Sequence, residues 1–299
     1  MLLLNKYKPM ILVTGADGQL GQELQALKKA YPFDFHFTDF EKLDITHPKR
    51  VNELFELQHF DYCINAAAYT AVDNSENDKL AAYEVNVVGT TNLAKACEKH
   101  GVRLIHISTD FVFDGKKNTP YTENDTPNPK GVYGTSKWQG EKNVLLYNPH
   151  TIILRTAWLY SSFGKNFVKT MLSLADKNPL NVVYDQLGSP TYARDLADTI
   201  LQIILNLEDK KFVEPHLWGT YHYSNEGVAS WYDFAQAIFE LSKQTKDKKV
   251  NLQPVRSVQF PTPAERPSYS VLDKSKIKQN FDIEIPHWRD ALKRCLNKM

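Results

Sequence analysis

Residues 10–21 have the sequence MILVTGADGQLG, which decides the fold expected for this chain. Met10–Val13 is a short apolar run of the kind that forms a buried parallel strand. Gly15, Gly18 and Gly21 follow it, and residues 22–29 continue a helical pattern whose apolar face is formed by Leu20, Leu24 and Leu27. A strand, a glycine loop and a helix in this order predict a nucleotide-binding unit.

Glycines at these positions have a physical role in binding a dinucleotide. Glycine permits the tight turn, lets the backbone approach a pyrophosphate, and lets the helix pack close to the sheet. The N–H groups at the start of the helix then face the phosphates. A purely structural turn is the alternative that the glycines leave open. We expect Gly15, Gly18, Gln19, Leu20 and Gly21 to contact a dinucleotide cofactor.

Acidic residues follow the second expected strand, residues 33–37. Asp39 lies at its end and can accept hydrogen bonds from the adenosine ribose hydroxyls, which favours NAD because a 2′-phosphate would meet a carboxylate. Phe40 brings no positive charge to offset this preference, although Asp39 could also be an ordinary residue at a strand end. We expect Asp44 and Ile45, further along, to contact the adenine.

Small residues end the third expected strand, residues 61–65. Ala66, Ala67 and Ala68 follow Asn65 there and would let the backbone come close to a ligand. A turn that is simply rich in small residues is the alternative. We therefore add these three alanines to the expected cofactor-binding residues.

Apolar strands alternate with helical segments through about residue 160. Besides the three strands above, strands are expected at 102–108 and 151–155, and helices at 22–29, 48–57, 81–99 and from Val132 onward. A helix of residues 81–99 would end at Gly101, a typical C-cap residue. This alternation predicts an α/β fold: a Rossmann-like, doubly wound parallel sheet with helices on both faces.

The second half of the chain has less regular periodicity and many prolines. Helices are expected at 167–176, 195–207 and 231–241, and a strand at 221–224. We expect residues 1–160 to form mainly an NAD(P)-binding Rossmann domain. Residues 161–299 are expected to form mainly a smaller substrate-binding lobe, interleaved with the first domain.

Tyr133 and Lys137 form the expected acid–base pair. Residues 126–131 are rich in helix breakers, so a helix that begins near Val132 would place both side chains on one face, one turn apart. A nearby ammonium favours the phenolate and would lower the pKa of Tyr133 from about 10. The alternative is a solvated Lys137 beside a packed Tyr133.

Length and composition limit the functional classes. The chain has 299 residues, 42% hydrophobic and 24% charged, with a formal net charge of +1. This balance argues against nucleic acid or an anionic membrane as the main partner, and no run of about 18 apolar residues exists to span a membrane. The three cysteines, Cys63, Cys97 and Cys295, suggest neither a disulfide scaffold nor a zinc site. Met1–Leu4 is too short for a signal peptide, so we expect a cytoplasmic protein.

These motifs, in this order, resemble the extended short-chain dehydrogenase/reductases. Within that superfamily, longer stretches are similar to the dTDP-4-dehydrorhamnose reductase family, and the similarity extends from about residue 10 to 293. The stretches are NAAAYTAVDNSE (65–76), STDFVFDG (108–115), YGTSKWQGE (133–141), LRTAWLY (154–160), DQLGSPTYARDLAD (185–198) and ERPSYSVLD (265–273).

The resemblance implies reduction of a 4-keto sugar on thymidine diphosphate by NADH or NADPH. It implies that Tyr133 donates a proton to the developing alkoxide and that Lys137 lowers the Tyr133 pKa and contacts the nicotinamide ribose. It also implies that Thr109 donates a hydrogen bond to the carbonyl oxygen. The implied substrate-binding residues are Thr109, Asp110, Tyr133, Trp158, Gly188 and Arg266. Trp158 could instead be a packed core residue, and Arg266 could form a surface salt bridge rather than bind a phosphate.

The chain departs from the family pattern at two positions. Tyr269 stands where the family often has Asn in its RPxxS motif. Some members bind Mg²⁺ at a subunit contact through acidic residues, one of which is replaced here by Arg194. A cation does not ligate a metal, so we expect no Mg²⁺ site, and either a monomer or a homodimer.

Four alternative functions have to be weighed. A sugar-nucleotide 4,6-dehydratase needs an Asp–Glu pair after the Thr, whereas Thr109 is followed by Asp110 and Phe111. A 4-epimerase, or another reductase of the superfamily, would also use the Tyr133–Lys137 pair. A non-catalytic NAD(P)-binding regulatory subunit would not need the proton-transfer residues, all of which are present.

Overall fold

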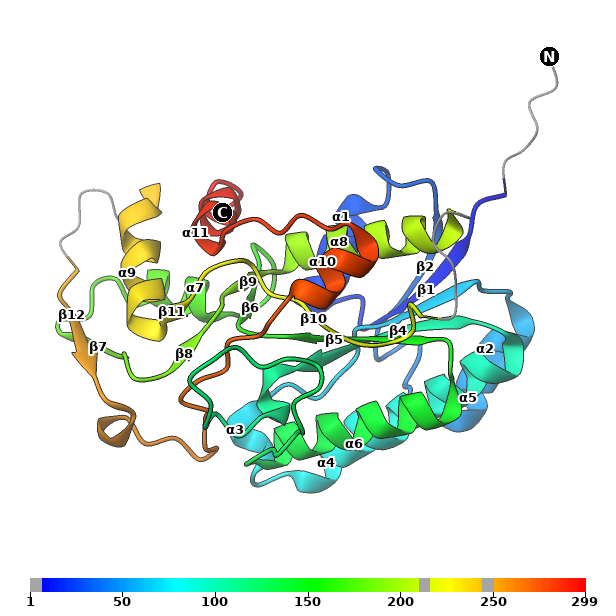
Figure 1. Cartoon of the computed structure of the whole chain (residues 1–299), viewed down its shortest axis with the longest axis horizontal. Coiled ribbons are helices and arrows are strands. Elements are labelled where there is room, and N and C mark those ends of the chain that lie inside the picture. Colours follow the sequence, from blue (N-terminus) through cyan, green and yellow to red (C-terminus); the bar gives the residue numbers. More distant parts are fainter. Residues whose placement is uncertain (1–6, 210–215, 244–249) are drawn as a thin grey trace, which may run out of the picture.

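A parallel sheet of six strands runs through the centre of the molecule (Figure 1). This computed structural model describes residues 7–209, 216–243 and 250–299, so Met1–Leu4 lies outside the described part. In the order of the sheet, the strands are β10 (Gly219–His222), β5 (Thr151–Thr156), β4 (Arg103–Thr109), β3 (Tyr62–Asn65), β1 (Met10–Thr14) and β2 (Asp34–Thr38). The order reverses at β1, which has β2 on one side and β3 on the other.

Alternate residues of the central strands enter two separate cores. In β1, Ile11 and Val13 belong to one buried cluster and Leu12 to the other. Neighbouring strands divide in the same way, since Tyr62 and Ile64 face the first core and Cys63 the second. Successive side chains of a strand point to opposite faces, so a sheet that is apolar at every position must be covered on both sides.

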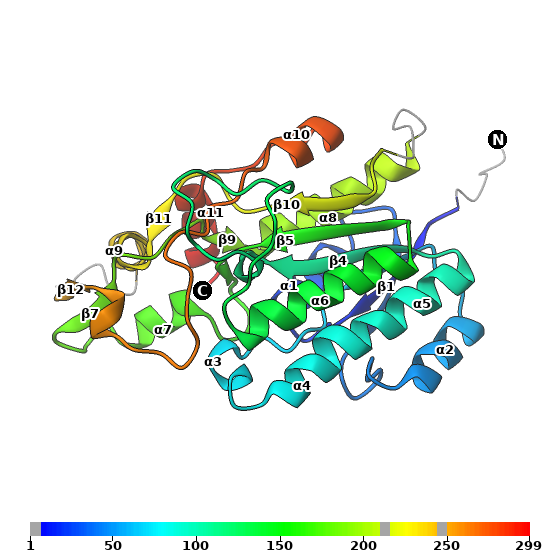
Figure 2. The same cartoon turned by 60° about the horizontal axis from the view of Figure 1, so that its bottom comes forward.

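Helices cover both faces of the sheet, as Figures 1 and 2 show. The first core packs under α1 (Gln19–Leu27), α8 (Ala193–Glu208) and α10 (Ser275–Phe281). The second core packs under α2 (Pro48–Leu57), α5 (Thr90–His100) and α6 (Val132–Tyr147). The doubly wound α/β fold expected from the sequence is therefore confirmed.

A third core belongs to a smaller lobe at the carboxyl ends of the strands. Its helices are α7 (Phe167–Ser173), α9 (Trp231–Leu241) and α11 (Trp288–Leu296). Its strands form short pairs: β6 (Leu159–Tyr160) with β9 (Thr191–Tyr192), β7 (Leu180–Val183) with β12 (Leu252–Val255), and β8 (Leu187–Gly188) with β11 (Ala229–Ser230). The second half of the chain also contributes to the sheet and its core, since β10 pairs with β5 and α8 packs in the first core.

The expected helix 81–99 is present as an unbroken helix whose hydrogen-bonding pattern changes along its length. It consists of α4 (Lys79–Tyr83), a π-helix η1 (Glu84–Gly89) and α5, which ends at Gly101 with a φ of 68°. A π-helical turn inside a helix is rare and often accompanies a functional site. The helix after the glycine loop begins at Gln19, three residues before the expected start.

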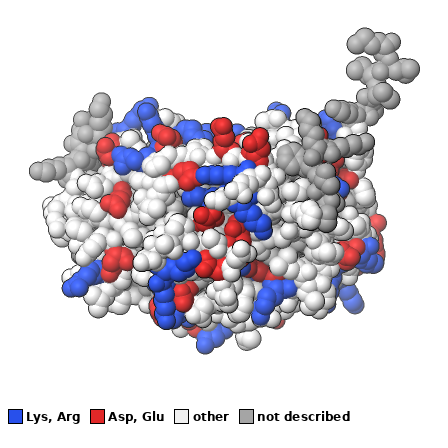
Figure 3. Space-filling view, in the orientation of Figure 1, with Lys and Arg blue, Asp and Glu red and all other residues white. Residues whose placement is uncertain are grey.

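Charges of both signs alternate over the face in Figure 3, with no large area of one sign. None of the helices in the described part of the chain is both long enough and apolar enough to cross a bilayer.

Candidate active site

A cavity of about 740 Å³ opens at the carboxyl ends of β1, β3 and β4. This is the point where the strand order reverses, the usual ligand site of a doubly wound sheet. The cavity is lined by the glycine loop, by the small residues after β3 and by Tyr133 and Lys137 on α6. The expected site residues that line it are Gly15, Gly18, Gln19, Leu20, Gly21, Asp39, Asp44, Ile45, Ala66, Ala67, Ala68, Thr109, Asp110, Tyr133, Lys137 and Trp158.

The glycine loop forms a cradle that larger residues would fill. A Cβ atom on Gly15 would lie 2.7 Å from the Ala66 carbonyl carbon, and one on Gly21 would lie 2.5 Å from the Ala16 carbonyl oxygen. Gly15 also has a φ of 69°, which favours glycine. No side chain caps the N-terminus of α1, so its first N–H groups remain available to an anion. The residues present fit the pyrophosphate of a dinucleotide.

At the far end of this cradle, Asp39 is less isolated than the sequence suggested. Its carboxylate accepts a hydrogen bond from the Lys42 N–H at 2.9 Å, and the Lys42 ammonium lies 3.5 Å away. Phe40 carries no charge, as expected, but Lys42 brings a positive charge beside Asp39. Asp44 lines the same region, where its carboxylate accepts hydrogen bonds from the backbone and hydroxyl of Thr46.

Helix α6 packs unusually close to its neighbours, and this closeness fixes the position of the acid–base pair. A Cβ atom on Gly134 would lie 2.2 Å from the Phe111 carbonyl oxygen, and one on Gly140 would lie 2.3 Å from the Asn86 oxygen. Asn86, in the π-helix, also donates to Ser136 on α6 at 3.0 Å. The expected start at Val132 is confirmed.

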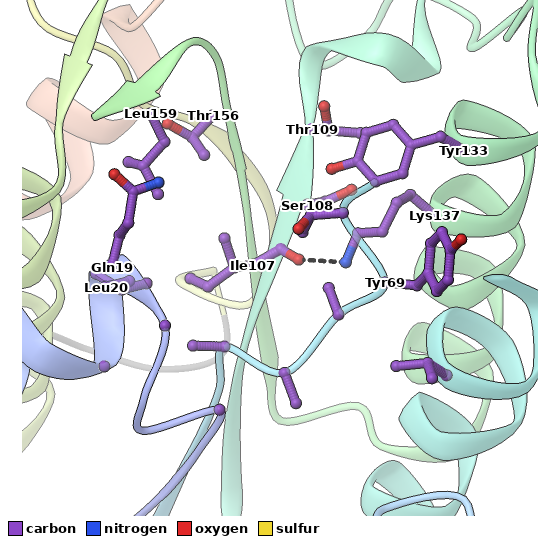
Figure 4. Close-up of a pocket in the computed structure, with 18 of the residues that line it drawn as sticks. Gln19, Leu20, Tyr69, Ile107, Ser108, Thr109, Tyr133, Lys137, Thr156 and Leu159 are labelled. Atoms are coloured by element: carbon purple, nitrogen blue, oxygen red, sulfur yellow. Dashed lines mark hydrogen bonds between the residues drawn. The ribbon is translucent and has the colours of Figure 1, made fainter. Parts of the chain in front are cut away.

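Tyr133 and Lys137 both project into the cavity, as Figure 4 shows. Lys137 is 2% exposed and donates a hydrogen bond to the Ile107 carbonyl oxygen at 2.7 Å. Burial lowers the pKa of Lys137 to about 8, opposed by the negative charge of Glu141. At a given pH, a larger fraction of Lys137 is therefore the neutral amine than would be the case in water.

The expected lowering of the Tyr133 pKa is contradicted by the structure. Burial raises the pKa of Tyr133 to about 12; a hydrogen bond with Thr109 acts in the opposite direction and the charge of Asp110 in the same direction. Desolvation of the phenolate therefore exceeds any effect of the neighbouring ammonium. Tyr133 is held as a neutral phenol, the form that can donate a proton.

Three buried polar atoms of the cavity lining have no protein partner among the described residues. They are the Ser108 hydroxyl, the Thr156 hydroxyl and the Oδ2 atom of Asp110, and all three residues line the cavity. The other oxygen of Asp110 accepts a hydrogen bond from Thr109 at 3.0 Å. Burial raises the pKa of Asp110 to about 6, although the nearby Ser270 and Thr109 hydroxyls oppose the rise. Unpaired polar atoms in a buried cavity favour a polar ligand.

Two expected substrate-binding residues do not line this cavity. Gly188 lies behind Trp158, because a Cβ atom there would be 2.6 Å from the Trp158 ring. Trp158 itself lines the cavity, has a φ of 48° and stacks on Trp231 at 3.5 Å between ring centroids. Arg266 forms the salt bridge that the sequence left open, with its Nη2 atom 2.7 Å from the Asp73 carboxylate.

Residue Arg194, expected to exclude a metal, lies 3.7 Å from the buried carboxylate of Glu23. Across residues 7–209, 216–243 and 250–299, no three His, Cys, Asp or Glu side chains group closely enough to hold a metal ion.

Several lining residues were not singled out from the sequence. Ser108 and Thr156 follow from the topology, since they lie near the carboxyl ends of the adjacent strands β4 and β5. Lys165 and Tyr69 lie in loops, and no periodicity in the sequence marks them. Only the pairing of distant segments brings these four residues to one cavity.

Comparison with known proteins agrees with this geometry. The model of the RmlD substrate binding domain matches residues 9–299. A dTDP-4-dehydrorhamnose reductase of Aggregatibacter actinomycetemcomitans is 42% identical over 287 residues, which cover 95% of this chain and 97% of that protein.

Solved structures show the same similarity. A dTDP-4-dehydrorhamnose reductase from Bacillus anthracis, in complex with NADP, has a TM-score of 0.90 and 37% identity, covering 98% of this chain and all of that one. The corresponding protein from Clostridium acetobutylicum has a TM-score of 0.88 and 41% identity, covering 97% of this chain and 99% of that one.

Proposed function

The chain belongs to the family of the RmlD substrate binding domain, and from that premise we propose that it is a dTDP-4-dehydrorhamnose reductase. It reduces the 4-keto group of dTDP-4-dehydro-L-rhamnose to give dTDP-L-rhamnose, with NADH or NADPH as cofactor. This reaction belongs to dTDP-rhamnose biosynthesis, which supplies cell-surface polysaccharides.

The catalytic residues in this proposal are Thr109, Tyr133 and Lys137. A nicotinamide cofactor bound along the glycine loop supplies the hydride. Tyr133, held as a neutral phenol, donates its proton to the oxygen that was the ketone. Thr109 lies beside Tyr133, and its hydroxyl, which donates to Asp110 Oδ1 in this structure, turns to donate a hydrogen bond to the same oxygen as its negative charge develops. Lys137 stabilises the phenolate that Tyr133 leaves behind.

The sugar is held by the unpaired polar groups of the cavity. Asp110 Oδ2 and the hydroxyls of Ser108 and Thr156 have no protein partner among the described residues, and each can bond a sugar hydroxyl or the carbonyl. Trp158, stacked on Trp231, offers a flat apolar surface. The observation that carries the proposal is the meeting of these groups with a glycine cradle in one cavity.

The alternatives are weaker on the same observations. A 4,6-dehydratase needs a carboxylate after Asp110, and Phe111 instead packs edge-on against the Tyr133 ring. A 4-epimerase shares the Tyr–Lys pair but not the relatives reported above. A regulatory subunit would not require a neutral Tyr133 and a buried Lys137 to face one cavity with unpaired polar groups.

Residues 1–160 provide mainly the NAD(P)-binding domain and residues 161–299 mainly the sugar-nucleotide-binding lobe, interleaved with it. The protein acts in the cytoplasm as a monomer or a homodimer, without nucleic acid or membrane partners. Arg266 and Gly188 act indirectly, Arg266 by pairing with Asp73 and Gly188 by leaving room for Trp158.

A spectrophotometric assay tests the function. Purified protein is offered dTDP-4-dehydro-L-rhamnose with NADH, and separately with NADPH, and oxidation of the nicotinamide is followed by absorbance. We expect consumption that depends on the sugar nucleotide, with dTDP-L-rhamnose as the product. Tight binding of NAD(P)H without any consumption would instead favour the regulatory subunit.

A further inference from the structure

A buried chain of polar side chains crosses the sheet and ends at Lys137. The Thr14 hydroxyl on β1 donates to Asn65 Oδ1 on β3 at 2.8 Å. Asn65 Nδ2 lies 3.1 Å from His106 Nδ1 on β4, and His106 Nε2 lies 3.5 Å from the Lys137 ammonium nitrogen on α6. His106 is fully buried, and neither the sequence motifs nor the mechanism above assigns it a role.

The orientation of the Asn65 amide follows from its neighbours. Its Oδ1 atom accepts two hydrogen bonds, one from Thr14 and one from the Ala67 N–H at 3.2 Å. Only an oxygen can accept both, so the NH₂ group of Asn65 must face His106. An NH₂ group donates, and His106 Nδ1 therefore acts as the acceptor.

This contact determines the tautomer of His106. Burial and the nearby Lys137 charge hold the pKa of His106 well below its ordinary value, so the ring is neutral. A neutral imidazole that accepts at Nδ1 carries its proton at Nε2. The Nε2–H group then faces the Lys137 nitrogen, whose other contact is the Ile107 carbonyl.

The consequence for Lys137 is asymmetric. A neutral amine has a lone pair that can accept the Nε2–H bond, whereas an ammonium has only N–H donors, which oppose it. The separation of 3.5 Å is longer than the about 2.7–2.9 Å that is typical of a charge-assisted hydrogen bond, so the ammonium is not donating a short bond to the imidazole.

We propose that His106, in a tautomer imposed by Asn65, is a positioning residue that favours the neutral form of Lys137 and so eases its release of a proton during turnover. The proposal rests on the proposed reductase function. In that reaction Tyr133 gives its proton to the substrate oxygen. Lys137 restores the phenol by giving up one N–H proton, and the resulting amine takes a proton from solvent.

The other titratable groups around Lys137 do not account for this effect. Tyr133 lies one turn before it on α6 and is neutral, and Asp110 lies in the cavity near Tyr133. Glu141, one turn after it, favours the ammonium, but its charge is shared with Arg155, whose Nη2 atom lies 2.6 Å away. Among the described residues, His106 is the side chain whose ring nitrogen lies at 3.5 Å from the Lys137 nitrogen, and in the tautomer set by Asn65 that nitrogen carries a proton.

The test is a titration of Lys137 in the intact protein without substrate. Lysine labelled with ¹³C at Cε is incorporated, and the Lys137 signal is assigned by its loss in Lys137→Met. In His106→Gln the amide oxygen can accept from the ammonium, and in Asn65→Asp the carboxylate accepts from Nδ1–H and reverses the tautomer. We expect the Lys137 titration midpoint to rise by about one pH unit or more in each variant.

Thr14→Val is the matched control, because the Ala67 N–H still fixes the amide and the tautomer stays. Its titration should match that of the unaltered protein. The alkaline limb of the pH profile of kcat should move with the midpoint in the two test variants. An unchanged midpoint in either folded test variant would overturn the proposal. A shifted midpoint in a protein that turns over no 4-keto sugar would overturn the reductase function and leave the role of His106 intact.

Discussion

The glycine-loop end of the cavity and the Tyr133 end use different parts of the chain. At the first end, backbone atoms surround the space so closely that a Cβ atom on Gly15 or Gly21 would overlap them. At the second end, the walls are buried side chains, and Ser108 and Asp110 carry polar atoms without protein partners among the described residues. The glycine-loop end therefore selects its ligand by shape, and the Tyr133 end selects a ligand that can form hydrogen bonds with the unpaired polar atoms.

The two ends should therefore respond differently to substitution. At the glycine loop, a larger side chain should lower the affinity for the cofactor before it affects other properties. At the Tyr133 end, loss of a single polar atom should harm turnover while cofactor binding is largely retained.

The largest effect is expected for Tyr133→Phe. Removal of the hydroxyl removes the proton donor but keeps the ring against Phe111, so kcat should fall by about a hundredfold or more. Stopped-flow and steady-state assays measure turnover, and fluorescence titration with NADPH measures cofactor affinity, which should change less than about threefold in comparison. Full turnover in the variant would show that another group supplies the proton.

A smaller effect is expected for Gly21→Ala. The new Cβ would lie 2.5 Å from the backbone oxygens of both Gly15 and Ala16, so the loop must shift. Overpacking of this kind destabilises by about 1–3 kcal/mol, and we expect cofactor affinity to fall about tenfold or more. Calorimetric titration with NADPH and thermal unfolding measure the two effects.

Gly18→Ala is the control for shape. Its Cβ would lie 3.2 Å from one atom, the Gly15 oxygen, so its losses should be clearly smaller than those of Gly21→Ala. Equal losses at both positions would indicate that the losses do not follow the overlap of the added Cβ atom, contrary to selection by shape.

Asp110→Asn should separate binding from stability. The buried carboxylate of Asp110 has a pKa raised from 3.8 to about 6, so the folded state binds a proton more readily than the unfolded state. Above pH 6 the folded protein carries a buried charge, and stability falls as pH rises from about 4 to 6 for this group. Asn removes that charge and should stabilise the substrate-free protein by up to about 3 kcal/mol at pH 8, with little gain near pH 4.

The same substitution should raise KM for the sugar nucleotide about tenfold, the usual scale for one lost hydrogen bond to a charged group. Thermal unfolding at pH 8 and pH 4, together with KM measured above pH 6, tests both statements. A destabilised variant at pH 8 would show that protein partners of Asp110 offset the cost of burying its charge. The carboxylate would then not be waiting for a ligand to provide that partner.

The sequence predicts the structure of the glycine-loop end of the cavity better than that of the Tyr133 end. The glycine loop, its strand and its helix are local, so residues 10–27 suffice to predict these three elements, although the Ala66 backbone that closes the cradle lies in another segment. Sequence also predicted that α6 begins at Val132 and that Tyr133 and Lys137 share a face, because both follow from local breakers and helical spacing.

The sequence could not predict what depends on pairing between distant segments. The raised pKa of Tyr133 results from burial by several elements, and the partner of Arg266, Asp73, is 193 positions away. The contact between Gly188 and Trp158 exists only after two short strand pairs form. Lys42 was missed for a different reason: it lies three residues from Asp39, and only the turn after β2 directs it back to the carboxylate.

The smallest effect is expected at the outer edge of the glycine-loop end, where Asp39 should select the cofactor by charge and hydrogen bonding rather than by shape. Its carboxylate should accept hydrogen bonds from a ribose and repel a 2′-phosphate, while Lys42, 3.5 Å away, attracts the same phosphate. Asp39→Ala should therefore weaken NADH several-fold and affect NADPH little, and Lys42→Ala should do the reverse. Dissociation constants for both cofactors in both variants measure this difference, at low salt because Lys42 is exposed. Equal losses of NADH and NADPH in Asp39→Ala would mean that the carboxylate supports only the turn through Lys42 N–H, and that shape alone governs the whole glycine-loop end.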